Sequence, residues 1–187
     1  LLFARAGTAY SFMSNEKMIN YTDDQIQDLI LKEYIGKKVI LLAPIVKSRK
    51  GHYRELFDSL SRQGFSKVRV NSIIVDLTPG MKVDRYKTHD IELVIDRFIV
   101  KNDHDFSKRL EESLVTAMHY GQDIVMVLDS KKNEARYFSR NLMCPSSGIS
   151  YPNPEPNSFS FNSPKGMCPS CKGLGIEHKV NLKKLIP

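Results

Sequence analysis

Three cysteines in the last quarter of the chain have the spacing of metal ligands. Cys168 and Cys171 form a C-x2-C pair, which the residues KGLG follow directly. Such a pair on a glycine-rich turn is typical of a zinc knuckle, because both thiolates reach one ion while the bent backbone points N–H groups at the sulfurs. A four-cysteine site needs a second pair about 15–20 residues away. Cys144, in the segment CPSSG, lies upstream at about that distance.

Ser147 stands where the fourth cysteine of such a site is expected. A neutral hydroxyl is a poor zinc ligand, so water or a histidine such as His178 is the better candidate for the fourth position. We therefore predict a weakened zinc site on Cys144, Cys168 and Cys171. The alternatives are two idle surface thiols or a redox pair, although a thioredoxin-type pair lies where a strand enters a helix.

The candidates for contacts with an acidic partner are six basic residues, Lys47, Arg49, Lys50, Lys67, Arg69 and Arg97. The first three lie where a helix is predicted to begin, which is an unfavourable place for cations. Their presence indicates a phosphate or carboxylate partner, the alternative being a solvated loop. Arg97 shares the register of an alternating apolar strand that includes Ile99. It either pairs with an internal Asp or meets an acidic partner at the end of the sheet, a surface that Lys67 and Arg69 are placed to share.

Composition and motifs exclude several function classes. The 187 residues carry 28 Lys and Arg against 21 Asp and Glu, a net charge of +7 that permits DNA or an acidic protein as partner. The sequence contains no G-x-x-x-x-G-K-[ST] phosphate loop and no spacing typical of a Ser-His-Asp or Cys-His set, so we expect no catalytic residues in this chain. No apolar run is long enough to span a membrane, and the cysteine spacing favours a reducing cytoplasm over a disulfide framework.

Hydrophobic periodicity predicts three helices and six strands. A capping box between Thr22 and Gln25 begins the first helix, and Gly36 stops it. Asn71 and Ser72 predict a two-residue hairpin turn, and Pro44 is expected to end regular pairing or to mark a sheet edge. The helices are expected at 22–36, 52–63 and 104–120, and the strands at 39–46, 68–70, 73–75, 90–100, 124–128 and 135–138.

The order of these elements predicts an α+β fold. Hairpin-like connections indicate a mixed, mostly antiparallel sheet with helices packed on one side. Beyond Arg140, Ser, Pro, Asn and Gly dominate and no periodicity remains, so a small irregular zinc-knuckle-like module is expected there. The residues LLFARAG at the start are expected to be the tail of a helix from a larger protein. The predicted domains are 1–20, 21–140 and 141–187.

Several segments together resemble the UvrA family, the damage-sensing subunit of the bacterial excinuclease ABC. They are LLFARAG at 1–7, LLAPIVKSRKG at 41–51, CPSSG at 144–148, EPNSFSFNSPKG at 155–166 and CPSCKGLG at 168–175. The fourth segment is far more specific than any C-x-x-C pair, and the likeness covers nearly the whole chain. In many relatives a cysteine pair follows the first segment, whereas residues 9–14 here, AYSFMS, contain no metal ligand.

The resemblance implies a division of labour along the chain. Residues 21–140 would dock UvrB, and the family's basic contacts to UvrB match Lys67 and Arg97. Residues 1–20 would be a remnant of the preceding ATPase region, and 141–187 would be the zinc-bearing start of the signature domain. The parent would be a homodimeric ABC-type ATPase of nucleotide excision repair and the SOS response that binds ATP and damaged DNA. Its first Walker A motif would precede Leu1, and the matching signature motif would follow Pro187.

Two other readings compete with a docking domain. The pattern C-x-x-C-x-G-x-G at 168–175 is also the repeat of the DnaJ co-chaperones, which carry four copies where this chain has one. The pair Cys168 and Cys171 would serve a thiol oxidoreductase if it were a redox centre. A thiol titration with and without a chelator separates a metal site from a redox pair.

Overall fold

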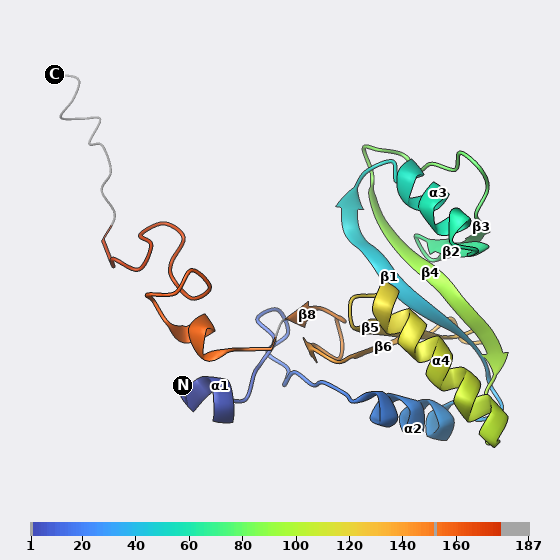
Figure 1. Ribbon diagram of the computed structural model, residues 1–187, viewed down its shortest axis with the longest axis horizontal. Helices are drawn as coiled ribbons and strands as arrows, with labels where there is room; N and C mark the ends of the chain where they lie inside the picture. The colour runs from blue at the N-terminus through green and yellow to red at the C-terminus, as the bar shows by residue number, and fades with distance from the viewer. Residues whose placement is uncertain (1, 152, 177–187) are drawn as a thin grey trace.

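The computed structural model describes residues 2–151 and 153–176 and is built on a six-stranded sheet (Figure 1). The strand order is β3-β2-β4-β1-β5-β6, and every pairing in this sheet is antiparallel. The strands are β1 (Lys38–Lys50), β2 (Lys67–Val70), β3 (Ile73–Asp76), β4 (Thr88–Ile99), β5 (Ile124–Asp129) and β6 (Ala135–Ser139). The predicted α+β class with a mostly antiparallel sheet is therefore confirmed.

Helices α2 (Asp23–Glu33), α3 (Arg54–Arg62) and α4 (His104–Tyr120) cover one face of this sheet. Helices α2 and α4 bury a cluster against β1, β4, β5 and β6 that contains Ile30, Leu41 and Leu110. Helix α3 buries a second cluster against β1, β2 and β4 that contains Phe57 and Leu93. Leu41 belongs to the first cluster and Ala43 to the second. The two residues are two positions apart in β1, so their side chains point to the same face of the sheet. The prediction that the helices pack on one side of the sheet is thus confirmed.

Local sequence signals set several element ends where they were predicted. The hydroxyl of Thr22 accepts from the Gln25 N–H at 3.3 Å, and the Gln25 side chain accepts from the Thr22 N–H at 3.0 Å, which confirms the capping box. Asn71 and Ser72 both have positive φ, as a two-residue turn between β2 and β3 needs. Strand β1 continues through Pro44 with a register shift, but β5 pairs only as far as Leu42, so Pro44 does lie at an edge.

A bulge in β4 changes which side chains face the helices. Leu41 pairs with Asp96 and Leu42 with Val94, so Ile95 is an extra residue in β4. Beyond it Phe98 packs with the helices, while Ile99 is 54% exposed. The prediction that Ile99 continues the apolar alternation of the strand is wrong, because the extra residue reverses the alternation.

The opposite face of the sheet, which we call the helix-free face, carries a third cluster without any helical residue. Its buried centre contains Leu42 and Met126, and Ile74 of β3 and Tyr137 of β6 pack against it. These two strands are the opposite edges of the sheet, so the sheet curves strongly towards this face. We define the helix-free face by Lys67, Arg69, Ile74, Glu92, Val94, Arg97 and Tyr137.

The segments before α2 and after β6 lie beside each other (Figure 1). Ile19 forms a bridge with Met143, and the rings of Phe3 and Phe159 are 6.0 Å apart. The short elements here are α1 (Leu2–Ala6), β7 (Leu142–Met143), β8 (Ser150–Tyr151) and a 3-10 turn at Pro156–Phe159. None of the described helices is long and apolar enough to cross a membrane.

Candidate functional site

Cys144 lies in a polar cluster built by two segments far apart in sequence. Its sulfur is 3.2 Å from the hydroxyl of Ser14, 3.4 Å from that of Ser146 and 3.4 Å from Oε2 of Glu16. The residue is fully buried. Hydrogen bonds from Ser14, and then from Ser146 and Ser147, lower the pKa of the Cys144 thiol to about 6.

The segment that supplies Ser14 has serines at the two positions where a zinc knuckle has cysteines. Ser11 and Ser14 have the spacing of a C-x2-C pair, and the Ser14 N–H lies 3.4 Å from the hydroxyl of Ser11. Ser11 is buried, and bridges at Tyr10–Lys17 and at Ile19–Met143 bring this turn to Cys144. Sequence reasoning assigned no site to this stretch, although the serine spacing is visible in it.

Cys168 and Cys171 lie on an irregular turn at the other end of the described chain. Cys168 is exposed, and backbone N–H groups of Cys171 and Ser170 lower the pKa of its thiol. Lys172 and Gly173 have positive φ, which the tight turn after the pair requires. This part of the structure confirms a glycine-dependent turn, and the pair does not sit where a strand enters a helix, as a thioredoxin-type pair does.

The described residues do not assemble the predicted zinc site. No group of three or more His, Cys, Asp or Glu side chains within 2–151 and 153–176 is arranged to hold a metal ion. Cys144 contacts serines and Glu16, not the Cys168–Cys171 pair, and His178 lies outside the described residues. The zinc site on Cys144, Cys168 and Cys171 therefore stays a prediction. The positions of the described side chains do not bring its three ligands together.

Arg97 is a basic candidate that is available for a partner. It is exposed, projects from the helix-free face and has no ion pair among the described residues. The neighbouring Asp96 instead binds Arg109 of α4 through two hydrogen bonds of 2.9 and 2.7 Å. Arg109, and not Arg97, thus forms the internal ion pair with an Asp that the sequence suggested for Arg97. Lys67, on the same face, is half-buried and pairs with Asp76 across the β2–β3 hairpin.

Arg69 is buried, contrary to the expectation that it presents its charge on the surface. Its guanidinium lies 3.4 Å from Glu92, with the two side chains 9% and 8% exposed. The curved sheet closes over this pair, and its burial raises the pKa of Glu92 against the attraction of Arg69. Arg69 Nε and Glu92 Oε2 have no hydrogen-bond partner within the part of the chain that the structure describes.

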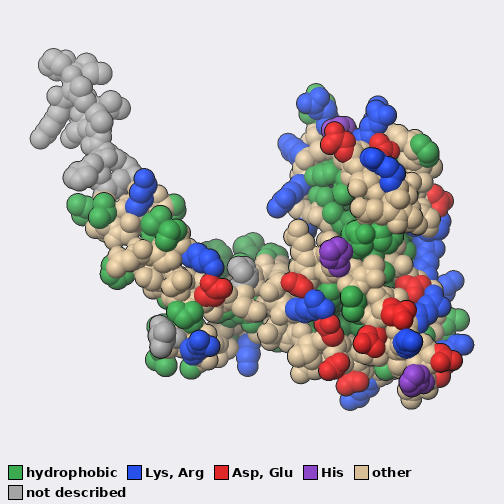
Figure 2. Space-filling view, in the orientation of Figure 1, with side chains coloured by type: hydrophobic (Ala, Val, Ile, Leu, Met, Phe, Trp, Pro, Cys, Tyr) green, Lys and Arg blue, Asp and Glu red, His purple; other side chains and the backbone are tan. Residues whose placement is uncertain are grey.

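The three candidates at the end of β1 have different surroundings. Lys47 donates a 2.9 Å hydrogen bond to the carbonyl of Ser147 and lies 5.3 Å from the ring centroid of Tyr137. Arg49 and Lys50 are exposed. Figure 2 shows Lys and Arg side chains gathered around this end of the molecule, where α3 begins. Lys47 thus contacts the CPSSG turn, and Arg49 and Lys50 stay available.

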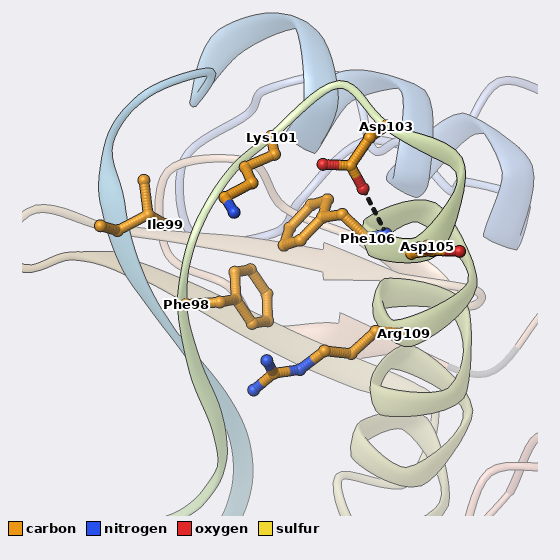
Figure 3. Close-up of a pocket in the computed structure, with 7 residues that line it drawn as sticks. All are labelled: Phe98, Ile99, Lys101, Asp103, Asp105, Phe106 and Arg109. Atoms are coloured by element: carbon orange, nitrogen blue, oxygen red, sulfur yellow. Dashed lines mark hydrogen bonds between the residues drawn. The ribbon is translucent and has the colours of Figure 1, made fainter.

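A pocket of about 500 Å³ lies at the end of β4, beside the start of α4 (Figure 3). The rings of Phe98 and Phe106 meet edge to face at 5.0 Å in it, and Asp103 caps α4 by accepting from the Phe106 N–H at 2.7 Å. Arg109 lies 6.0 Å from the Phe98 ring. Asp103 and Arg109 already have structural partners, the Phe106 N–H and Asp96, so no chemistry is assigned to this pocket.

Comparison of the sequence with known proteins identifies the family of this chain. Residues 21–131 match the family model described as the UvrA interaction domain. The whole chain is 38% identical to the UvrABC system protein A of Methanothermobacter thermautotrophicus and 40% identical to that of Mycobacterium bovis. The protein of the same name from Salmonella typhimurium is 39% identical. The chain spans 20% of the length of each of these relatives. The chain therefore belongs to the UvrA family, and residues 21–131 form its interaction domain.

Proposed function

We propose that this chain recruits UvrB through the helix-free face of its sheet. The observation that carries the proposal is Arg97, an exposed arginine without an ion pair among the described residues, next to the exposed Ile99. An apolar side chain beside an unneutralised arginine suits a protein partner with an acidic contact. Lys67 adds a second cation to the same face, although Asp76 already pairs with it.

Binding of the 187-residue chain to purified UvrB, measured by calorimetry without nucleotide, tests this proposal. We expect Lys67→Glu combined with Arg97→Glu to weaken binding at least tenfold, about 1.4 kcal/mol, because the opposing carboxylates lose partners and meet like charge. A matched control is Lys32→Glu with Lys108→Glu, which makes the same charge change on the exposed surfaces of α2 and α4. Equal affinity in both double variants would remove the helix-free face as the docking site.

We propose that the chain acts within a larger protein, a cytoplasmic ABC-type ATPase of nucleotide excision repair that binds damaged DNA as a homodimer. Support comes from family membership and from the share of the relatives that the chain covers. The chain has no phosphate loop, so it should neither bind nor hydrolyse ATP by itself. ATP turnover that copurifies with the chain and persists through contaminant controls would contradict this division of activities. Family membership decides against the DnaJ-type reading.

A further inference from the structure

Three cationic side chains and one histidine surround a hollow at the far end of the sheet. Lys50 is the last residue of β1, His52 lies in the connection from β1 to α3, and Lys82 and Arg85 lie in the connection between β3 and β4. The hollow has a volume of about 590 Å³. Lys50 is far from Lys82 and Arg85 in sequence, so only the fold brings these three cations together.

Most of this positive charge has no internal partner. Lys50, Lys82 and Arg85 are exposed, and none of them forms an ion pair within 2–151 or 153–176. The acidic residue closest in sequence, Asp84, accepts from the Tyr86 N–H at 3.0 Å and lies 3.8 Å from Lys87. Like charges held together without counterions repel one another, and a polyanion in the hollow relieves that repulsion.

The loops are held in place before any ligand arrives. The Val83 N–H donates to the His52 carbonyl at 3.1 Å, which joins the two loops directly. Behind them His89 is buried, with its Nε2 2.7 Å from the Asp84 carbonyl and its Nδ1 3.0 Å from the side chain of Asn71. The carbonyl can only accept, so Nε2 carries the proton. Because the hollow is already formed, little ordering free energy opposes binding.

The composition of the hollow favours a nucleic acid over a protein. Protein interfaces have apolar cores that are depleted of charge, whereas nucleic-acid interfaces are polar and strongly positive. The prominent exposed ring here is Tyr86, which is 74% exposed beside Arg85. Single-strand binding usually relies on several aromatic platforms, while duplex binding relies on phosphate contacts. We propose that this hollow binds the phosphate backbone of duplex DNA, independently of the helix-free face.

The test is fluorescence anisotropy of a labelled 20-base-pair duplex with the 187-residue chain across a range of KCl concentrations. We expect Lys82→Ala with Arg85→Ala to weaken binding at least tenfold at low salt. The slope of log K against log salt should also fall by about 2, one for each lost phosphate contact. Lys32→Ala with Lys108→Ala, which removes the same charge from another surface, should change neither quantity.

Three results would overturn the proposal. The first is no measurable binding of the duplex at low salt. The second is an equal effect of the two double variants, which would make binding a matter of net charge. The third is competition by polyglutamate as strong as competition by unlabelled duplex at equal charge, which would indicate an acidic protein partner. UvrB binding should be unchanged in the Lys82 and Arg85 variant, so this test and that of the docking face fail separately. Circular dichroism confirms that each variant is folded.

Discussion

The sulfur of Cys144 lies 3.2 Å from the hydroxyl of Ser14, although the two residues are 130 positions apart. The cluster around them joins two turns with C-x2-C spacing, Ser11–Ser14 and Cys144–Ser147. Cys144 is the single cysteine among these four positions. We therefore expect the chain purified from zinc-supplied cells to contain well under one equivalent of zinc. Ser11, Ser14 and Ser147 occupy the other three positions of the two turns.

Replacing these three serines by cysteine should create a zinc site. In the Ser11→Cys, Ser14→Cys, Ser147→Cys variant, four thiolates would face one another, as a structural tetrahedral site requires. Metal analysis should then approach one zinc per chain, and the melting temperature should fall when a chelator is added. Ser61→Cys, Ser107→Cys and Ser130→Cys together, at positions far apart in sequence, are a control with the same number of new thiols. A zinc content that rises equally in both variants would show that Ser14 and Cys144 do not face one site.

Arg140 ties the start of α2 to the rest of the domain. It donates hydrogen bonds of 2.7 and 2.6 Å to Asp23 and one of 3.1 Å to Asp123. The two bonds that Arg140 donates to Asp23 lower the pKa of that carboxyl group. We expect Arg140→Ala to reduce the free energy of unfolding by about 1–2 kcal/mol at pH 7, because these charge-assisted bonds are only partly screened by solvent.

The pH dependence of this loss has a definite sign. The folded pKa of Asp23 is below its unfolded value, so the stabilisation is present above the unfolded pKa, about 3.9, and disappears as pH falls through the folded pKa. Urea unfolding should therefore show the gap between wild type and Arg140→Ala shrinking below about pH 4. Arg62→Ala, which removes an exposed arginine that contacts no carboxylate among the described residues, should leave stability within about 0.5 kcal/mol. A gap that stays constant down to pH 3 would contradict the assignment.

The buried pair of Arg69 and Glu92 predicts an asymmetric mutational pattern. Arg69→Met leaves a buried carboxylate without its counter-charge, so we expect a loss of about 3–5 kcal/mol at pH 7. Replacing both residues, as Arg69→Met with Glu92→Leu, should be near neutral or stabilising, because two charges no longer need desolvation. Denaturant titration of the three proteins measures both effects.

The pH dependence of the single variant separates charge burial from lost packing. Burial raises the folded pKa of Glu92 above its unfolded value, and removing Arg69 raises it further. The folded state then holds a proton that the unfolded state has released. The stability of Arg69→Met should consequently be greatest below the unfolded pKa, about 4.3, and fall as pH rises towards 7. If Arg69→Met reduces the free energy of unfolding by the same amount at pH 5 and pH 7, lost packing alone explains the reduction.

Gly148 tests the contact between the CPSSG turn and the sheet. It has φ +63°, and a Cβ placed there would lie 2.8 Å from the ring of Tyr137. Gly148→Ala should therefore cost about 1–2 kcal/mol for the left-handed backbone and a further amount for displacing the ring. Gly36→Ala, at φ +72° with open space around it, is the matched control for the backbone cost alone. Equal melting temperatures in the two variants would show that the turn does not pack on Tyr137.

The sequence by itself determined the elements whose signals are local. The capping box at Thr22 and Gln25, the two-residue turn at Asn71 and Ser72 and the apolar run of β1 each depend on neighbours within a few positions. The α+β class followed from their order. The family resemblance, carried by segments such as EPNSFSFNSPKG, was also readable without a structure.

The tertiary structure alone decided what each candidate side chain contacts. Arg69 and Arg97 look alike in sequence, yet the curved sheet buries the first against Glu92, and the bulge at Ile95 leaves the second exposed. Cys144 has the spacing to join Cys168, but Ser14 reaches it instead because the bridge between Ile19 and Met143 brings that turn alongside. Sheet curvature, register and long-range pairing sum over many residues, so no local pattern records them.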